Sequence, residues 1–306
     1  MELRHLRYFV VVAEEGHITS AAERLGMQQP PLSQRIRALE RELDVQLFRR
    51  KPRGVELTAA GRALLIEARA VLDRLDQAVI TARRTARGEQ GRISVGLTSA
   101  AAFPPLVAKV VREFREAFPL VSVAPEEAYA FDLIERIRDD QIDVAFMRTP
   151  VANPEGLILN QLLEEPMVVA LPRAHTLAQP RSGKNAALSL RALAGETFIF
   201  PGRPDGERTL INDAIFAACH AAGFSPRVGQ QALHIVSMLS LVAAGLGISI
   251  VSASVQRMKI DGVVYRPLRG VMPKAPLVIV SRRGNPSPLV RQFMKLVKHT
   301  AKSFRI

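Results

Sequence analysis

Two adjacent prolines, Pro30 and Pro31, stand between two segments whose apolar residues both recur at helical spacing. Proline breaks a helix interior, but it is tolerated in the first helical turn, where its missing N–H would have no intrahelical partner. The pair therefore predicts that a new helix starts here and continues through PLSQRIRALEREL. Its apolar face is predicted to consist of Leu32, Ile36, Leu39 and Leu43.

Two further helices are predicted before the prolines. The first has apolar residues at helical spacing from Leu3 onward and ends at Gly16. The second, SAAERLG, is short, takes Thr19 or Ser20 as its N-cap and ends at Gly26. Two short helices, a glycine turn and a helix with a polar first turn together form a helix-turn-helix.

The start of the third predicted helix is rich in side chains that can read bases. In a helix-turn-helix this end enters the major groove, where glutamine recognises adenine and arginine recognises guanine. An ordinary solvated face would explain Arg37, but not the polar cluster at the helix start. The candidate DNA-binding residues of this motif are Thr19, Gln28, Gln29, Pro30, Pro31, Ser33, Gln34, Arg35 and Arg37.

A basic hairpin is predicted directly after the helix-turn-helix, in FRRKPRGVELT. Its four cations are Arg49, Arg50, Lys51 and Arg53, and the proline and glycine beside them turn the chain. A cluster of this kind is often only a solvated loop. After a helix-turn-helix it favours a wing, in which Arg50 and Arg53 contact phosphates or the minor groove.

A long helix follows, capped by Thr58 and ending in the sequence GEQG, which is interpreted as a hinge. Its apolar residues alternate spacings of three and four, as in a heptad seam, which favours pairing with a partner chain. Packing on its own domain is the alternative. The seam residues are Leu65, Ala68, Leu72, Leu75, Val79 and Ala82.

From Arg92 onward strand and helix patterns alternate, which predicts a parallel, open sheet with helices on both faces. The strands are too many for one small sheet, so two α/β subdomains are expected. The fold class is therefore α/β with an all-α winged helix-turn-helix domain at the N-terminus. The expected domains are 1–58 (winged helix-turn-helix), 59–90 (linker and dimerisation helix) and 91–306 (a two-lobed α/β effector domain).

The segment from LRHLRYFVVVAEEGHITSAAERLG through MQQPPLSQRIRALERELDVQLFRRKPRGVELTAAGRALL resembles the LysR-type transcriptional regulators. LLEEPMVVALPRAHTLA and LVAAGLGISIVSAS resemble that family's effector domain, which is similar to periplasmic solute-binding proteins. The resemblance implies two lobes joined by crossovers near Glu165 and Pro267. Lobe I would comprise about 91–165 and 268–306, and lobe II about 166–267.

The resemblance also implies a homodimer assembling into a homotetramer that binds an interrupted palindrome in double-stranded operator DNA. It implies activation of a neighbouring operon and repression of the protein's own gene, with RNA polymerase as a further candidate partner. QQPPLSQ resembles members that control aromatic-compound catabolism, so an aromatic or dicarboxylic acid is the expected small-molecule effector.

A ligand cleft is predicted beyond the carboxyl ends of the strands, beside helix N-termini, where open α/β sheets bind their ligands. Each candidate also has an ordinary structural role: the hydroxyls as helix caps, the arginine in an ion pair, the histidine as a satisfied side chain. The candidate effector-binding residues are Thr98, Ser99, Ala100, Arg148, Phe200, Pro201, Gly202, His234, Ile235 and Ser237.

Charge and composition limit the other classes of function. The net charge of +13 favours an anionic partner, and the single cysteine, Cys219, excludes an intrachain disulfide and indicates the reducing cytoplasm. The uncharged stretch from Ser237 to Val255 has membrane-spanning length, but its serines and its Gly-Leu-Gly favour a buried helix, turn and strand.

An enzyme is a poorer interpretation of the sequence. Cys219 and His220 are neighbours on a predicted helix and point apart, and the histidines lack metal-ligand spacing. Gly245 and Gly247 lack the third glycine of a dinucleotide loop. A transport solute-binding protein would need a signal peptide and no helix-turn-helix. No catalytic residue, cofactor or metal is therefore predicted.

Overall fold

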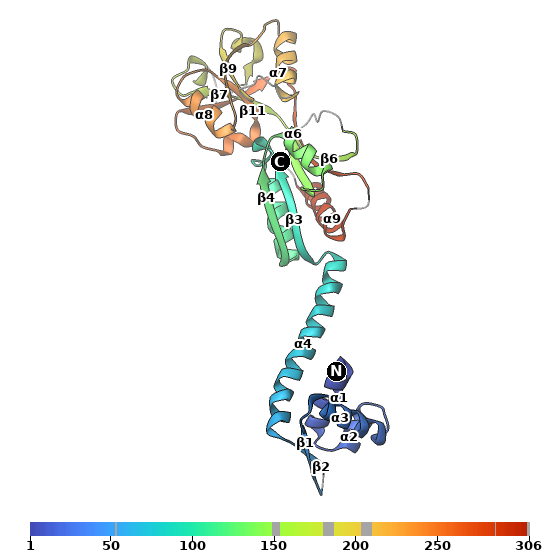
Figure 1. Cartoon of the computed structure of the whole chain (residues 1–306). Helices are drawn as coiled ribbons and strands as arrows, with labels where there is room; N and C mark the ends of the chain where they lie inside the picture. The colour runs from blue at the N-terminus through green and yellow to red at the C-terminus, as the bar shows by residue number, and fades with distance from the viewer. Residues whose placement is uncertain (53, 149–153, 180–186, 203–209, 285, 305–306) are drawn as a thin grey trace. The chain divides into compact units, whose positions relative to one another are not determined.

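A computed structural model describes residues 1–52, 54–148, 154–179, 187–202, 210–284 and 286–304. The chain forms two compact units, Met1–Arg84 and Thr85–Ile306, which are described separately (Figure 1). The first unit contains helices α1 (Leu3–Glu15), α2 (Ile18–Arg24) and α3 (Gln29–Leu43), then strands β1 (Phe48–Lys51) and β2 (Gly54–Leu57). Helix α4 (Ala59–Arg87) begins in it.

Helix α3 begins where the prolines predicted. Gln28 is its N-cap, and the prolines occupy its first turn. The predicted cap of α2 is wrong: His17 is the N-cap, and Thr19 lies inside the first turn. The reason is the tightness of the preceding turn. Gly16 ends α1 in the left-handed conformation, and only one extended residue separates it from α2.

The first unit has one apolar core, to which all four helices contribute. Phe9 and Leu32 are fully buried in it, and Ala68 of α4 is 1% exposed. Leu65 and Leu72 also pack against this core, so the first half of the predicted seam contacts its own domain. Val79, farther along α4, is 41% exposed. The predicted seam is thus divided: its first residues pack on the core of their own domain, and Val79 is part of an exposed apolar face.

The second unit begins where α4 ends. Gly88 is buried and in the left-handed conformation, and a Cβ there would lie 2.5 Å from the backbone nitrogen of Leu289. A five-stranded sheet follows, in the order β4-β3-β5-β13-β6, and it defines lobe I. Its strands are β3 (Gln90–Leu97), β4 (Leu120–Glu127), β5 (Val144–Arg148), β6 (Leu157–Glu165) and β13 (Ala275–Arg282). Its helices are α5 (Pro105–Ala117), α6 (Ala130–Arg138) and α9 (Pro288–Ser303).

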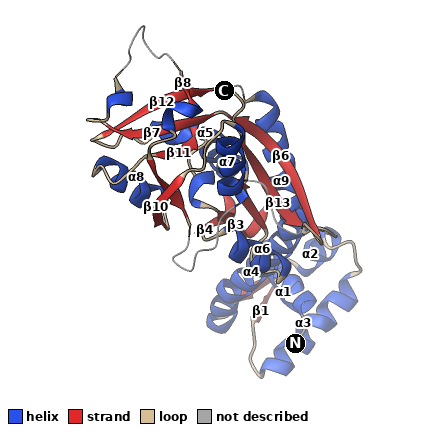
Figure 2. Cartoon of the chain, turned by 90° about the horizontal axis from the view of Figure 1, so that it is seen from above, coloured by secondary structure: helices blue, strands red, loops and turns tan. Residues whose placement is uncertain are grey.

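Lobe II contains a four-stranded sheet in the order β11-β7-β12-β8 and a parallel pair, β10-β9. Its strands are β7 (Met167–Pro172), β8 (Leu188–Ser189), β9 (Thr197–Pro201), β10 (Arg227–Ala232), β11 (Ser249–Ser252) and β12 (Val263–Arg269). Its helices are α7 (Leu210–Ala221) and α8 (Ile235–Ala243). Figure 2 shows the helices and strands of both lobes from above.

One sequence prediction for these lobes needs correction. The sheet of lobe I is mixed, because β13 returns from lobe II and runs antiparallel to both β5 and β6. The chain passes from lobe I to lobe II after Glu165, at the end of β6. It returns just after Pro267: that proline pairs with Val168 in β12, and Leu268 and Arg269 still pair with β8.

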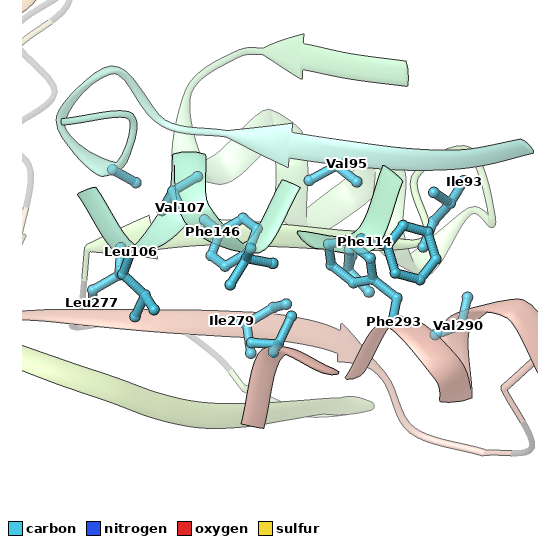
Figure 3. Packing of buried hydrophobic residues seen from close by; sticks show 14 of the residues in the cluster. Ile93, Val95, Leu106, Val107, Phe114, Phe146, Leu277, Ile279, Val290 and Phe293 are labelled. Atoms are coloured by element: carbon cyan, nitrogen blue, oxygen red, sulfur yellow. The ribbon is translucent and has the colours of Figure 1, made fainter. Parts of the chain in front are cut away.

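Aromatic side chains fill the core of lobe I between its sheet and the helices α5 and α9 (Figure 3). The rings of Phe114 and Phe293 meet edge to face, with their centres 4.8 Å apart, and the ring of Phe146 lies next to that of Phe293. In lobe II, the uncharged stretch from Ser237 to Val255 forms α8, a turn and β11, as predicted. No helix among the described residues is long and apolar enough to cross a membrane.

Replacing Phe293 by alanine should lower the free energy of unfolding by about 3–5 kcal/mol, because a fully buried ring is replaced by a cavity. Urea unfolding followed by circular dichroism measures this change. Phe131→Ala is the matched control, because that ring is 63% exposed, and it should change stability by less than about 0.5 kcal/mol. Equal losses in both variants would contradict this account of the core.

Candidate functional site

The start of α3 presents an exposed polar surface. Leu32, Ile36 and Leu39 are buried, and this leaves the predicted DNA-binding side chains on the outer side of the helix. Thr19, Gln28, Gln29, Pro30, Gln34 and Arg37 are exposed, while Pro31, Ser33 and Arg35 are half-buried. The structure thus leaves every candidate of the helix-turn-helix at least partly accessible.

Tyr8 of α1 supports this surface, which the sequence alone did not indicate. The guanidinium carbon of Arg35 lies 5.6 Å from the centre of the Tyr8 ring, within the range of a cation–π contact. Such a contact limits the rotamers of the arginine before any partner binds. A tyrosine among apolar residues gave no signal of this role, because only the fold brings α1 beside α3.

The basic hairpin forms as predicted, with β1 and β2 paired antiparallel. The start of β2, next to the hairpin turn, is fixed to the turn between α1 and α2: the Val55 N–H donates to the Gly16 carbonyl at 2.7 Å. Gly54 is required for this approach, since a Cβ there would lie 2.3 Å from the same Gly16 oxygen. Glu40 of α3 holds the preceding loop by accepting from the backbone N–H groups of Leu47 and Phe48.

The charges of the hairpin are not equivalent. Lys51 pairs with Glu56 on the opposite strand, and its ammonium lowers the pKa of that carboxyl. Arg49 and Arg50 are exposed and have no ion pair within the described part of the chain. Arg53 lies outside the described residues. Arg49 and Arg50 are therefore the described wing cations whose charge is available to phosphates.

In the second unit, two of the predicted ligand-binding segments come together across the lobes. The backbone N–H of Ile235, in the first turn of α8, is 3.5 Å from the hydroxyl of Ser99. His234, the N-cap of α8, lies 3.7 Å from Glu127 at the end of β4. Ala100 packs against the core of lobe II. These residues come from the turn after β3, the end of β4 and the start of α8, and with Thr98 we call them the inter-lobe group.

Thr98 is an unusual member of this group. Its hydroxyl is buried and has no hydrogen-bond partner among the described residues. Its backbone N–H donates to the Phe146 carbonyl, which fixes the turn that follows β3. A buried hydroxyl without a partner costs free energy, so this oxygen is a natural place for a ligand atom to bind.

Arg148, another predicted effector-binding residue, is buried among contacts from both lobes. Its side chain is 7% exposed and forms a buried ion pair with Glu165, at 2.6 Å. It also donates to the carbonyl of Ala275 and to the hydroxyls of Ser252 and Ser254. Burial lowers the pKa of Arg148, while Glu165 opposes that shift. Because Glu165 compensates its charge, this arginine connects the two lobes, and its buried Nε has no hydrogen-bond partner among the described residues.

The other lobe II candidates divide into two groups. Phe200 is 2% exposed and stacks on Phe198 and Phe216, so it belongs to the core, which corrects its predicted ligand-binding role. Pro201 is half-buried, and its carbonyl accepts from the Asn212 amide.

Gly202 is buried, and its N–H donates to the carbonyl of Ala232. Ala232 lies two residues before His234, the N-cap of α8. Ile235 is buried, whereas Ser237 is exposed on the first turn of α8. The backbone of Gly202 is thus tied to the segment that leads into α8, and Ser237 belongs to the first turn of that helix.

Comparison with known proteins covers nearly the whole chain. Residues 3–62 match the family "Bacterial regulatory helix-turn-helix protein, lysR family", and residues 86–302 match "LysR substrate binding domain". HTH-type transcriptional regulator BudR of Raoultella terrigena is 37% identical, over 97% of this chain and 100% of its own. The Hca operon transcriptional activator HcaR of Escherichia coli is 34% identical, with 97% of each chain covered.

Solved structures agree with these sequence matches. The crystal structure of full-length CbnR complexed with its target DNA superposes with a TM-score of 0.84 at 28% identity, covering 98% of this chain and 100% of that one. Full-length BenM superposes with a TM-score of 0.59 at 30% identity, covering 99% and 96%. The predicted fold class, a helix-turn-helix domain followed by a two-lobed α/β domain, is thereby confirmed.

Replacing Glu165 by glutamine should destabilise the protein by about 3–5 kcal/mol, because it leaves the Arg148 charge buried without its counter-ion. The double variant Arg148→Met/Glu165→Leu should recover most of the loss, since no unpaired charge remains. Urea unfolding measures both. The adjacent Glu164 is exposed and pairs with Lys274, so Glu164→Gln should have little effect. Similar losses at both glutamates would rule out a special role for the buried pair.

Proposed function

The chain belongs to the LysR family of ligand-responsive, DNA-binding transcriptional regulators, which are not enzymes, and from this premise we propose that an acidic small molecule binding between its lobes controls transcription. The observation that carries the proposal is the convergence of Thr98 and Ser99 with the first turn of α8. The proposed effector is an aromatic or dicarboxylic acid, in keeping with the resemblance of the QQPPLSQ segment to regulators of aromatic catabolism.

The chemistry of this group suits a carboxylate. The N-terminal turn of α8 offers backbone N–H groups and the positive end of the helix dipole. The hydroxyls of Thr98 and Ser99 add donors from lobe I, and His234 adds a polar ring at the edge. A carboxylate accepting from both lobes would favour the arrangement in which they are closest. Ligand binding thereby shifts the population of lobe arrangements.

On the DNA side, the proposal assigns base reading to Gln29, Ser33, Gln34 and Arg35, and backbone contacts to Arg50 and Arg53. The operator is double-stranded DNA with an interrupted palindrome, bound by a homotetramer built from homodimers. The exposed apolar residues of α4, Val79 among them, support pairing of that helix with a second copy. The effector would act by changing the spacing of the DNA-binding domains in this assembly.

The proposed outcome is activation of a neighbouring catabolic operon, with repression of the protein's own gene and RNA polymerase as a candidate contact. The relative HcaR is named as an operon activator, which supports this direction of control. An enzymatic or transport role for the two lobes is the alternative from the sequence. It leaves the winged helix-turn-helix and its exposed polar surface without a purpose.

The first test separates base reading from phosphate contact on a DNA site selected from a random pool by the wild-type protein. Arg35→Ala should cost roughly 1–3 kcal/mol of binding and relax the preference at one base pair. Arg50→Ala should weaken binding to all sequences and flatten the salt dependence by about one unit of slope. Fluorescence anisotropy at several salt concentrations measures both.

Two results would contradict these assignments. If Arg35→Ala reduces affinity equally on selected and random DNA, Arg35 does not read a base. An unchanged salt slope in Arg50→Ala excludes a phosphate contact by the wing. Lys51→Ala is a useful control on the same hairpin, because Glu56 already compensates the Lys51 charge. It should alter the salt slope less than Arg50→Ala.

The second test concerns the ligand. An acid that stabilises the protein in a thermal-shift screen is titrated calorimetrically into the wild type and into Ser99→Ala. The variant loses one hydrogen bond to a charged group, worth roughly 1.5–3 kcal/mol, so affinity should fall about tenfold to hundredfold. DNA binding without the acid should be unchanged. Equal affinities would move the site elsewhere, and loss of DNA binding as well would make Ser99 a folding residue.

A further inference from the structure

Lobe I contains a groove of about 380 Å³ that is separate from the inter-lobe group. It lies between β6, the edge strand of the five-stranded sheet, and α9, which packs against that strand (Figure 2). It is lined by residues of β6, of the end of β13, of the loop before α9 and of α9 from Val290 to Lys298. Its volume falls within the range of small-molecule sites, roughly 300–1,000 Å³.

The floor of the groove is apolar and partly open to water. It is formed by Ile158 of β6 and by Val290 and Met294 of α9. Ile158 is 41% exposed although it is a large apolar side chain. Asn160 lies on the same strand, and its amide nitrogen is buried without a hydrogen-bond partner among the described residues. The groove thus combines exposed apolar surface with a donor that lacks an acceptor.

The wall of the groove is cationic. Arg282, Arg291, Lys295 and Lys298 all line it. Arg282 pairs with Asp140, and Arg291 donates to the Pro286 carbonyl. Lys295 and Lys298 are exposed and lie three positions apart on α9, so they are neighbours on one side of the helix. Neither has an ion pair within the described ranges. Like charges this close repel each other, and an anion between them would relieve that repulsion.

We propose that this groove binds a small organic anion with an apolar body, in addition to the effector proposed between the lobes. The acid group lies between Lys295 and Lys298, and the apolar body covers Ile158 and Met294. The Asn160 amide supplies a directional hydrogen bond to an acceptor on the same ligand. The groove is too small for a folded partner, and its charge excludes cationic or basic ligands.

The test uses the full-length protein with ¹³C-methyl methionine and 2-naphthoate as the probe. The Met294 methyl signal, assigned by its loss in Met294→Leu, should shift saturably as naphthoate is added. Lys295→Glu and Lys298→Glu should each weaken this binding by roughly fivefold to tenfold. Lys302→Glu is the matched control, because it makes the same change of charge on α9 outside the groove and should keep wild-type affinity.

Further arms test the ligand class and the location. Neutral 2-naphthamide and inorganic phosphate should each bind more weakly than naphthoate, since each lacks one half of the proposed recognition. The buried Met147 signal reports whether the variants remain folded. The proposal is overturned if the Met294 signal does not move, or if the three lysine variants behave alike. It also fails if phosphate alone binds as well as naphthoate, or if Ser99→Ala abolishes the Met294 response.

Discussion

The buried contact of Arg148 with Glu165 is the interaction that fixes the geometry in which the two lobes are joined. Arg148 ends β5 in lobe I, Glu165 ends β6 at the first crossover, and the Ala275 carbonyl begins β13 after the second crossover. Ser252 and Ser254 join from lobe II. One guanidinium therefore connects both crossovers to both lobes. A charged, hydrogen-bonded group suits this place because its contacts are directional, whereas apolar packing would allow the lobes to slide against each other.

The residues of the inter-lobe group belong to the two lobes that Arg148 and Glu165 connect. Ser99 contacts the first turn of α8 at 3.5 Å, the limit of a hydrogen bond, and the His234–Glu127 contact is similarly long. Away from the connector, the polar contacts between the lobes are thus weak, and they lie beside the apolar contact of Ala100 with lobe II. Weak interactions are easily exchanged for contacts with a ligand, which is what a sensor requires.

Sequence patterns identified the elements whose physics is local. Pro30 and Pro31 start α3 because an intrahelical N–H is not needed there, and the hairpin follows from its turn residues and charges. Ser99 was assigned to the site because it follows a strand, and His234 because a helix begins near it. Local rules of this kind do not depend on distant partners.

Other features depended on contacts that no local pattern contains. The role of Arg148 as a connector was not predicted, because its partners Glu165 and Ser254 are 17 and 106 positions away. Phe200 was placed in the cleft because it follows a strand, yet its neighbours Phe198 and Phe216 bury it. In both cases tertiary packing decided what the local pattern could not.

The central claim, that an acid binds between the lobes, is tested most directly by hydrogen exchange in the full-length protein with and without a stabilising acid. The account predicts that amide exchange slows together in two segments, Thr98–Ala101 and His234–Ser237, and that Ser99→Ala removes the effect. A ligand that protects neither segment, or only one lobe, would contradict the account.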